Sequence, residues 1–90
     1  MTANKTPLHY AILKLFMDGS EKHAGEIVET LRDEYAGYKL LTVKDVDETL
    51  ATAKENGLLD ETSCDLDGQG ALRIFYQIND FGREMVDKYL

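Results

Sequence analysis

The chain contains very little proline or cysteine and no tryptophan. Of its 90 residues, Pro7 is the only proline and Cys64 the only cysteine. A single cysteine excludes a disulfide within the chain and favours an intracellular compartment. No apolar run approaches the ~18 residues that a membrane-spanning helix needs, and the first residues lack the apolar core of a signal peptide. We therefore expect one soluble, cytoplasmic domain over residues 1–90, with residues 1–5 disordered.

Positive charge is also scarce. The chain has 17 aspartate and glutamate residues against 10 lysine and arginine residues, which gives a formal net charge of −7. Acidity of this degree favours solubility, but it weakens the long-range attraction of a protein to phosphate groups. Charge alone therefore disfavours a nucleic acid as the ligand.

The first helix is predicted just after the single proline. Thr6 suits the N-cap, with Pro7 at the first helical position, where a missing N–H costs nothing. Asp18-Gly19 ends the helix. Its apolar residues cover a wide arc, which is typical of a helix that is central to a core or buries one face on a partner. They are Leu8, Tyr10, Ala11, Ile12, Leu13, Leu15, Phe16 and Met17.

The second helix is predicted from Glu21 or His23 to Tyr35, and its buried stripe recurs at helical spacing. Ala36-Gly37-Tyr38 breaks it. The short apolar segment 39–41 that follows is the usual place for a small strand that pairs with a later hairpin. The stripe consists of Ile27, Val28, Leu31 and Tyr35.

The third helix has the clearest start. Thr42 and Asp45 fit a capping box, in which the Thr42 hydroxyl accepts the Asp45 N–H and the Asp45 carboxylate reaches back. Gly57 suits the left-handed position that ends the helix. One face is apolar at 3.6-residue spacing and is expected to be buried. It consists of Val43, Val46, Leu50 and Ala53.

Two strands and a short helix complete the chain. Residues 61–66 and 71–78 are predicted strands, and Asp67-Gly68-Gln69-Gly70 supplies the positive-φ residues of a tight hairpin. Asn79 or Asp80 caps the last helix. The order ααβαββα with short connections predicts an α+β fold, a winged helix-turn-helix with a three-helix core and a small antiparallel β-wing; another small α+β domain is the runner-up. Apolar contacts of the last helix are expected from Phe81, Met85, Val86, Tyr89 and Leu90.

Segments along nearly the whole chain carry a family resemblance. They are Thr6–Leu13, Glu26–Leu31, Leu50–Leu59 and the run Phe-Tyr-Gln-Ile-Asn-Asp-Phe-Gly-Arg-Glu over residues 75–84. Together they resemble the PadR-like family of bacterial winged-helix regulators, and the last run is similar to that family's tyrosine-rich strand and the helix start after it. The resemblance implies a transcriptional regulator that binds duplex DNA.

The candidate DNA contacts are few. In a helix-turn-helix the outward face of the third helix enters the major groove. Opposite the buried stripe this face carries one base, Lys44, and three acids, Asp45, Glu48 and Glu55. Arg73 in the last strand would reach the minor groove, and helix-terminal N–H groups near Lys44 favour a phosphate. The predicted DNA-binding residues are Lys39, Thr42, Lys44, Gln69 and Arg73.

Two functions stay open. The first is a small DNA-binding transcriptional regulator, which forms a homodimer through its first or last helix. The second is an acidic protein–protein interaction module, an adaptor or anti-repressor, which binds a basic protein partner through Asp45, Glu48 and Glu55 and does not touch DNA. The alternative to a DNA contact for Arg73 is a pairing across the hairpin with one of three carboxylates, Asp60, Glu61 or Asp65.

No catalytic or metal site is expected. His9, His23 and Cys64 lie far apart without the spacing of metal ligands. A lone cysteine in a strand is usually a small buried apolar residue, so Cys64 is expected to be buried. Gly68-Gln69-Gly70 lacks the helix and the lysine of a phosphate-binding loop. We therefore expect no enzyme activity, no metal and no cofactor.

Overall fold

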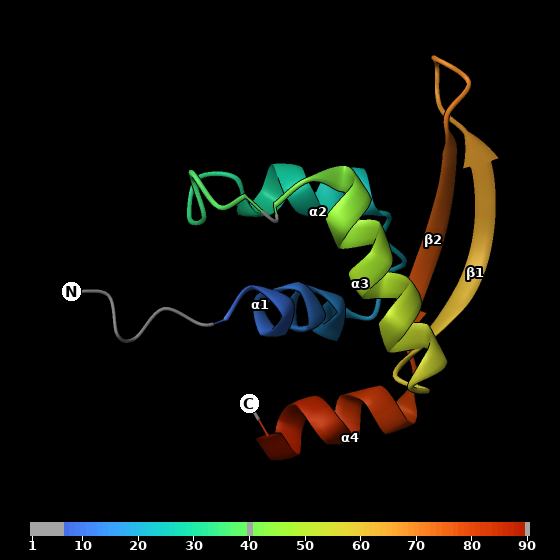
Figure 1. Cartoon of the computed structure of the whole chain (residues 1–90). Helices are drawn as coiled ribbons and strands as arrows, with labels where there is room; N and C mark the ends of the chain where they lie inside the picture. Colours follow the sequence, from blue (N-terminus) through green and yellow to red (C-terminus); the bar gives the residue numbers. More distant parts are fainter. Residues whose placement is uncertain (1–6, 40, 90) are drawn as a thin grey trace.

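Three helices pack beside a two-stranded hairpin, and a fourth helix follows the hairpin (Figure 1). The computed structural model describes residues 7–39 and 41–89. Thr6, Leu40 and Leu90, on which parts of the sequence predictions depend, lie outside these ranges. The elements are α1 (Leu8–Leu15), the 3-10 turn η1 (Phe16–Asp18), α2 (Ala24–Leu31), α3 (Val43–Glu55), β1 (Leu59–Leu66), β2 (Leu72–Ile78) and α4 (Asp80–Tyr89). The predicted α+β winged helix-turn-helix is confirmed.

The first helix begins one residue later than predicted. Pro7 has the extended angles φ −54° and ψ 145° and is itself the N-cap; its carbonyl accepts the Ala11 N–H at 3.0 Å. The helix tightens into η1, and Gly19 ends it with a φ of 84°. Glycine suits this left-handed conformation because it has no Cβ. The predicted stop at Asp18-Gly19 is therefore confirmed.

The second helix has a capping box built on histidine. Nδ1 of His23 accepts the Gly25 N–H at 3.1 Å, and the Glu26 carboxylate accepts the His23 N–H at 3.0 Å. Regular helix ends at Leu31, so the predicted end at Tyr35 was wrong. Hydrogen-bonded turns follow over residues 32–37, in which the Tyr35 N–H still donates to the Leu31 carbonyl at 3.0 Å, and Tyr35 is fully buried, as predicted.

The third helix starts with the predicted cap. The Thr42 hydroxyl oxygen accepts the Asp45 N–H at 3.1 Å and donates to the Asp45 carboxylate at 2.9 Å. Val43 is 53% exposed, contrary to prediction, because it occupies the first helical position at the outer end of α3. The rest of the apolar face, Val46, Leu50 and Ala53, is buried.

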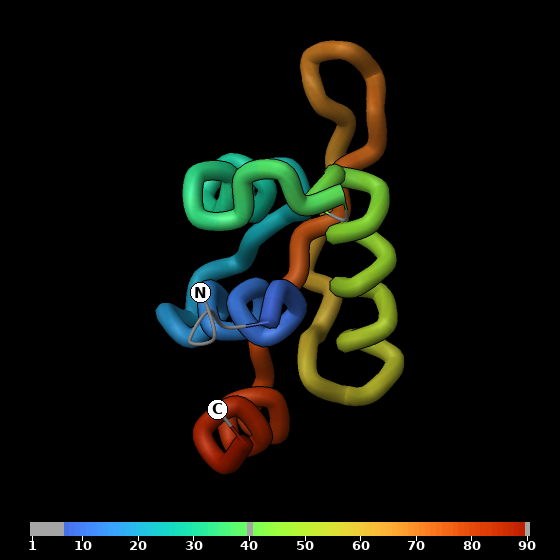
Figure 2. The backbone as a smooth tube through the Cα atoms, turned by 60° about the vertical axis from the view of Figure 1, so that its left-hand side comes forward, coloured from blue at the N-terminus to red at the C-terminus, as the bar shows by residue number. Residues whose placement is uncertain are grey.

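The hairpin extends well beyond the helices in both views (Figures 1 and 2). Its strands are antiparallel, and β1 begins two residues before the predicted start. The Asp67 carboxylate fixes the turn by accepting the backbone N–H groups of Gln69 and Ala71 at 2.8 and 2.9 Å. Gly70 is the one residue of the four-residue turn that has a positive φ, at 84°, whereas several were predicted.

A third segment pairs with the hairpin, but it is not the predicted one. The Lys22 N–H donates to the Tyr76 carbonyl at 2.8 Å, and the Tyr76 N–H donates to the Lys22 carbonyl at 2.9 Å. Lys39 and Leu41, the described residues of the predicted strand, have no strand pairing. The backbone beside β2 therefore comes from between α1 and α2.

The core lies between α1, α2, α3 and the base of the hairpin. Asn79 caps α4, as predicted, by accepting the Gly82 N–H on its side-chain oxygen at 2.8 Å. Phe81 and Tyr89 are 49% and 63% exposed, so α4 contributes fewer apolar contacts than expected. The buried apolar residues are Ile12, Phe16, Ala24, Ile27, Val28, Leu31, Tyr35, Val46, Leu50, Ala53, Leu59, Tyr76, Ile78 and Val86.

Asp18 fixes the turn between η1 and the Lys22 segment. Its carboxylate accepts the Ser20 N–H at 2.9 Å and the Lys22 ammonium at 3.0 Å, and these hydrogen bonds lower the pKa of Asp18 to about 2. Because the folded pKa is depressed, the contribution to stability is present above the unfolded pKa of ~3.9 and is lost as the pH falls through about 2.

We expect Asp18→Asn to be less stable than the wild type at pH 7, with the difference vanishing below pH 2. Urea unfolding at several pH values measures this difference, and NMR titration of the carboxyl carbon gives the midpoint directly. Asp33→Asn, in the exposed turn after α2, is the control and should leave stability at pH 7 unchanged. A titration midpoint of Asp18 near 4 would contradict the prediction.

Candidate nucleic-acid interface

The third helix lies at the surface beside the hairpin (Figures 1 and 2). Val46, Leu50 and Ala53 point inward, so Lys44, Glu48, Thr52 and Glu55 are exposed. This is the helix that a helix-turn-helix places in the major groove. The helical spacing of its apolar residues thus orients the polar face outward.

Three predicted DNA contacts lie at the beginning of α3. Lys39 and Lys44 are exposed, and within residues 7–39 and 41–89 neither side chain forms a salt bridge. The Thr42 hydroxyl is committed to the cap of α3. Two cations therefore flank the N-terminus of a helix, where unpaired N–H groups also favour an anion.

The other two predicted contacts lie on the hairpin. Arg73 forms two hydrogen bonds with the Asp65 carboxylate, Nε to Oδ1 and Nη2 to Oδ2, both at 2.8 Å. The hydrogen bond to Arg73 lowers the pKa of Asp65, and the same bond raises the pKa of Arg73. The alternative pairing across the hairpin is confirmed with Asp65. Gln69 is exposed in the turn.

Arg73 also lies on the face of β2 that is turned away from α3. Ile74 and Tyr76 line a cavity together with residues of α3. Since successive strand residues point to opposite faces, Arg73 and Phe75 lie on the other side. The Arg73 guanidinium is 5.7 Å from the centre of the Phe75 ring, which agrees with this assignment. The structure therefore does not place Arg73 beside Lys44.

Acidic groups dominate the surface of α3. Glu48 and Glu55 are exposed, and Asp45 is partly buried against Thr42. Asp47, which was not among the predicted site residues, is also partly buried, and burial raises its pKa. Lys54 pairs with Glu61 at 3.3 Å. The cations of α3 therefore do not offset its carboxylates.

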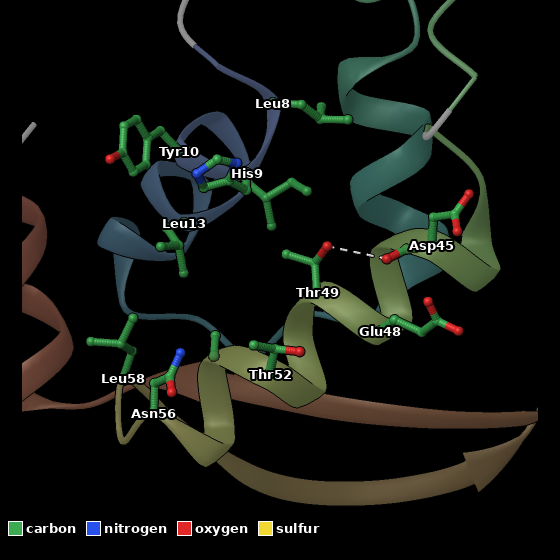
Figure 3. Close-up of a pocket in the computed structure, with 12 residues that line it drawn as sticks. Leu8, His9, Tyr10, Leu13, Asp45, Glu48, Thr49, Thr52, Asn56 and Leu58 are labelled. Carbon is green, nitrogen blue, oxygen red and sulfur yellow. Dashed lines mark hydrogen bonds between the residues drawn. The ribbon is translucent and has the colours of Figure 1, made fainter.

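A groove of about 610 Å³ separates α1 from α3 (Figure 3). Leu13 and Leu58 lie at one end, and Thr49 and Thr52 line the α3 side. The Thr49 hydroxyl donates to the Asp45 carbonyl at 3.1 Å. Sequence reasoning missed this groove; the wide apolar arc of the first helix was the available signal.

A second cavity of about 280 Å³ lies between α3 and the hairpin. Its walls combine the α3 residues with two apolar or aromatic side chains of β2. It was not predicted, because it depends on how closely α3 approaches the sheet. The lining consists of Lys44, Asp47, Glu48, Ala51, Ile74 and Tyr76.

Residues 7–39 and 41–89 were also searched for a metal site and for a membrane-spanning helix. No group of three or more His, Cys, Asp or Glu side chains among residues 7–39 and 41–89 is arranged to hold a metal ion. None of the helices in this part of the chain is both long enough and apolar enough to cross a membrane. Cys64 is exposed, contrary to prediction, because its strand extends past the core.

Comparison with known proteins finds a likeness in structure rather than in sequence. No protein-family model and no curated protein sequence matches the chain. A proposed transcriptional regulator from Thermoplasma acidophilum has a TM-score of 0.70 and 21% identity over 91% of this chain and 75% of its own. A PadR-like transcriptional regulator from Bacillus cereus has a TM-score of 0.66 and 21% identity over 90% of this chain and 75% of its own. The chain is thus a winged helix-turn-helix whose fold resembles that of PadR-like regulators.

Proposed function

We propose that the protein is a small DNA-binding transcriptional regulator of the PadR-like type. The exposed position of α3 beside the projecting hairpin carries this proposal, because a helix so placed can enter the major groove. The fold neighbours support it, since both are described as transcriptional regulators. We assign the DNA contacts to Lys39, Thr42, Lys44, Gln69 and Arg73.

Binding through these residues is expected to be weak for a single chain. Lys39 and Lys44 are available, whereas Arg73 must exchange the Asp65 carboxylate for a phosphate. Few phosphate contacts give low affinity, and the affinity falls as salt displaces the protein from the duplex. The backbone N–H groups at the start of α3, near Thr42, would add one further phosphate contact.

A homodimer would double the number of contacts. Phe81 and Tyr89 on α4 are exposed, and Tyr10 on α1 is 37% exposed. Exposed aromatic side chains of this kind are enriched in protein interfaces. We therefore propose pairing through α1 or α4, which would place two copies of α3 on one duplex.

Lys44→Gln is expected to weaken DNA binding uniformly across sequences and to lower the slope of log K against log salt by about 1. The measurement is fluorescence anisotropy with labelled mixed-sequence duplexes, starting at ~20–50 mM salt, where phosphate contacts are strongest. Lys14→Gln on α1 removes the same charge away from α3 and is the control. Absence of binding by the wild type at low salt, or an equal loss in both variants, would refute the proposed interface.

A second candidate function is supported by the charges. Asp65 neutralises Arg73, while Glu48 and Glu55 on α3 are exposed. These features suit an acidic protein-interaction module that binds a basic protein partner, with Asp45 beside them. Charge reversal separates the two functions: Lys44→Glu with Arg73→Glu should abolish DNA binding and spare a basic partner, whereas Glu48→Lys with Glu55→Lys should do the opposite.

A further inference from the structure

One face of the hairpin stays apolar beyond the point where the hairpin leaves the core. The strand register pairs Leu66 with Leu72 and Cys64 with Ile74. Directly opposed residues share a face, and so do alternate residues of one strand. These four residues, named here the apolar wing face, therefore lie on the side of the hairpin that faces α3, since Ile74 lines the cavity there.

The core accounts for Ile74 alone, which packs against it, whereas the other three residues of this face are exposed. Leu66 and Leu72 are 64% and 59% exposed, and the hairpin extends beyond the helices at this point (Figures 1 and 2). The opposite face carries the Asp65–Arg73 pair, as a solvated hairpin requires. Exposed apolar surface that is continuous with a cavity is typical of a binding surface.

The cavity that joins the apolar wing face to α3 at Ile74 carries more negative than positive charge. Asp47 and Glu48 line the cavity at its base, with Lys44 as the cation among its lining residues. An apolar floor between carboxylates is complementary to a segment with one apolar face and flanking positive charges.

We propose that the groove between α3 and the apolar wing face binds a basic amphipathic helix of a partner protein. Large side chains at positions i, i+3 or i+4 and i+7 would contact Leu66, Leu72 and Ile74, and lysine or arginine residues beside them would face Glu48. The cavity of about 280 Å³ takes one such side chain. This proposal rests on the second candidate function and specifies its partner and its surface.

Other occupants fit less well. Duplex DNA would gain no hydrogen bonds from an apolar floor, and the acidic walls would repel its phosphates. A second copy of the chain would bring the same acidic groups against Asp47 and Glu48, because an isologous contact presents the same surface twice. The charges therefore favour a basic partner of different sequence.

The test uses a synthetic amphipathic peptide of leucine and lysine with helical spacing, and a scrambled peptide of the same composition. Isothermal titration should show binding of the first peptide alone, with NMR amide shifts at Ala51, Leu66, Leu72 and Ile74. Leu66→Ser with Leu72→Ser should weaken binding by roughly tenfold or more, since each leucine loses buried apolar contact. Val43→Ser, at another exposed apolar residue that does not line the cavity, is the matched control and should bind as the wild type does.

Each alternative result has a definite meaning. Binding that falls with Glu48→Lys and Glu55→Lys but is unchanged by the leucine substitutions would overturn the groove and leave the interaction function standing. Equal binding of both peptides, or none, would overturn the groove as well. A change in oligomeric state of the leucine variant in light scattering would assign the surface to a second copy. Circular dichroism of each variant checks that the fold is retained.

Discussion

Gly82→Ala is expected to destabilise the protein by about 2–3 kcal/mol. Gly82 is buried in the first turn of α4. A Cβ at this position would overlap the Leu58 carbonyl oxygen and would lie 2.7 Å from Cγ1 of Ile78. The carbonyl is fixed because it accepts the Asn79 N–H at 3.2 Å, so the clash must move α4.

The sign of this effect is informative, because alanine favours an isolated helix over glycine by about 1 kcal/mol. A loss of stability therefore reports the packing of α4 against the start of β1. Urea unfolding followed by circular dichroism gives the free energy. Gly68→Ala in the hairpin turn is the control; no atom lies within 4 Å of its added Cβ, and its stability should stay within ~0.5 kcal/mol of the wild type. Equal stability of the two variants would mean that α4 packs elsewhere.

Phe16→Ala should have the largest effect on stability, a loss of about 3–5 kcal/mol. Phe16 is fully buried in η1, where it joins the core between the helices. Its removal leaves a cavity that the neighbouring rigid elements cannot fill. Since a domain of this kind is stable by only ~5–15 kcal/mol, the variant is expected to be partly unfolded at 37 °C.

Phe81→Ala makes the same chemical change at a residue that is 49% exposed, and it should cost less than ~1 kcal/mol. Thermal unfolding of both variants at one protein concentration compares them directly. Two similar melting temperatures would show that the core is not centred on Phe16.

The parts of the fold that sequence predicts are those controlled by neighbouring residues. The cap at Thr42, the cap at Asn79 and the hairpin turn each depend on a few adjacent side chains, and all three are present. The end of α2 could not be predicted from the spacing of its apolar residues. Tyr35 is buried although it lies beyond the last helical residue, so its burial does not mark the end of the helix. The pairing of Lys22 with Tyr76 could not be predicted, because an isolated bridge leaves no periodic pattern in the sequence and depends only on how the two segments pack in the fold.

In the candidate site, too, the features set by neighbouring residues could be predicted and those set by tertiary packing could not. Strand alternation and opposite charge made the Arg73 pairing with Asp65 foreseeable. Both grooves depend on the placement of α3 relative to α1 and to the hairpin, which no local pattern encodes. Cys64 was expected to be buried because alternation identifies the apolar face of a strand but not how far that face extends past the core. The charge pairing and the strand register could therefore be predicted from the sequence, whereas the two grooves could not.

The outer edge of β1 is open in the described part of the chain, because β2 joins it on one side and Lys22 joins β2 from the far side. An open edge is a template for pairing with another chain, and runaway pairing of this kind leads to aggregates. Here the edge carries Asp60, Glu61 and Asp65, and a bulge between Glu61 and Ser63 interrupts its register. Glu61 and Asp65 are already paired with Lys54 and Arg73, so the bulge is the main obstacle: two hairpins that met edge to edge would have mismatched backbone hydrogen bonds there. The bulge thus protects the exposed hairpin from polymerisation.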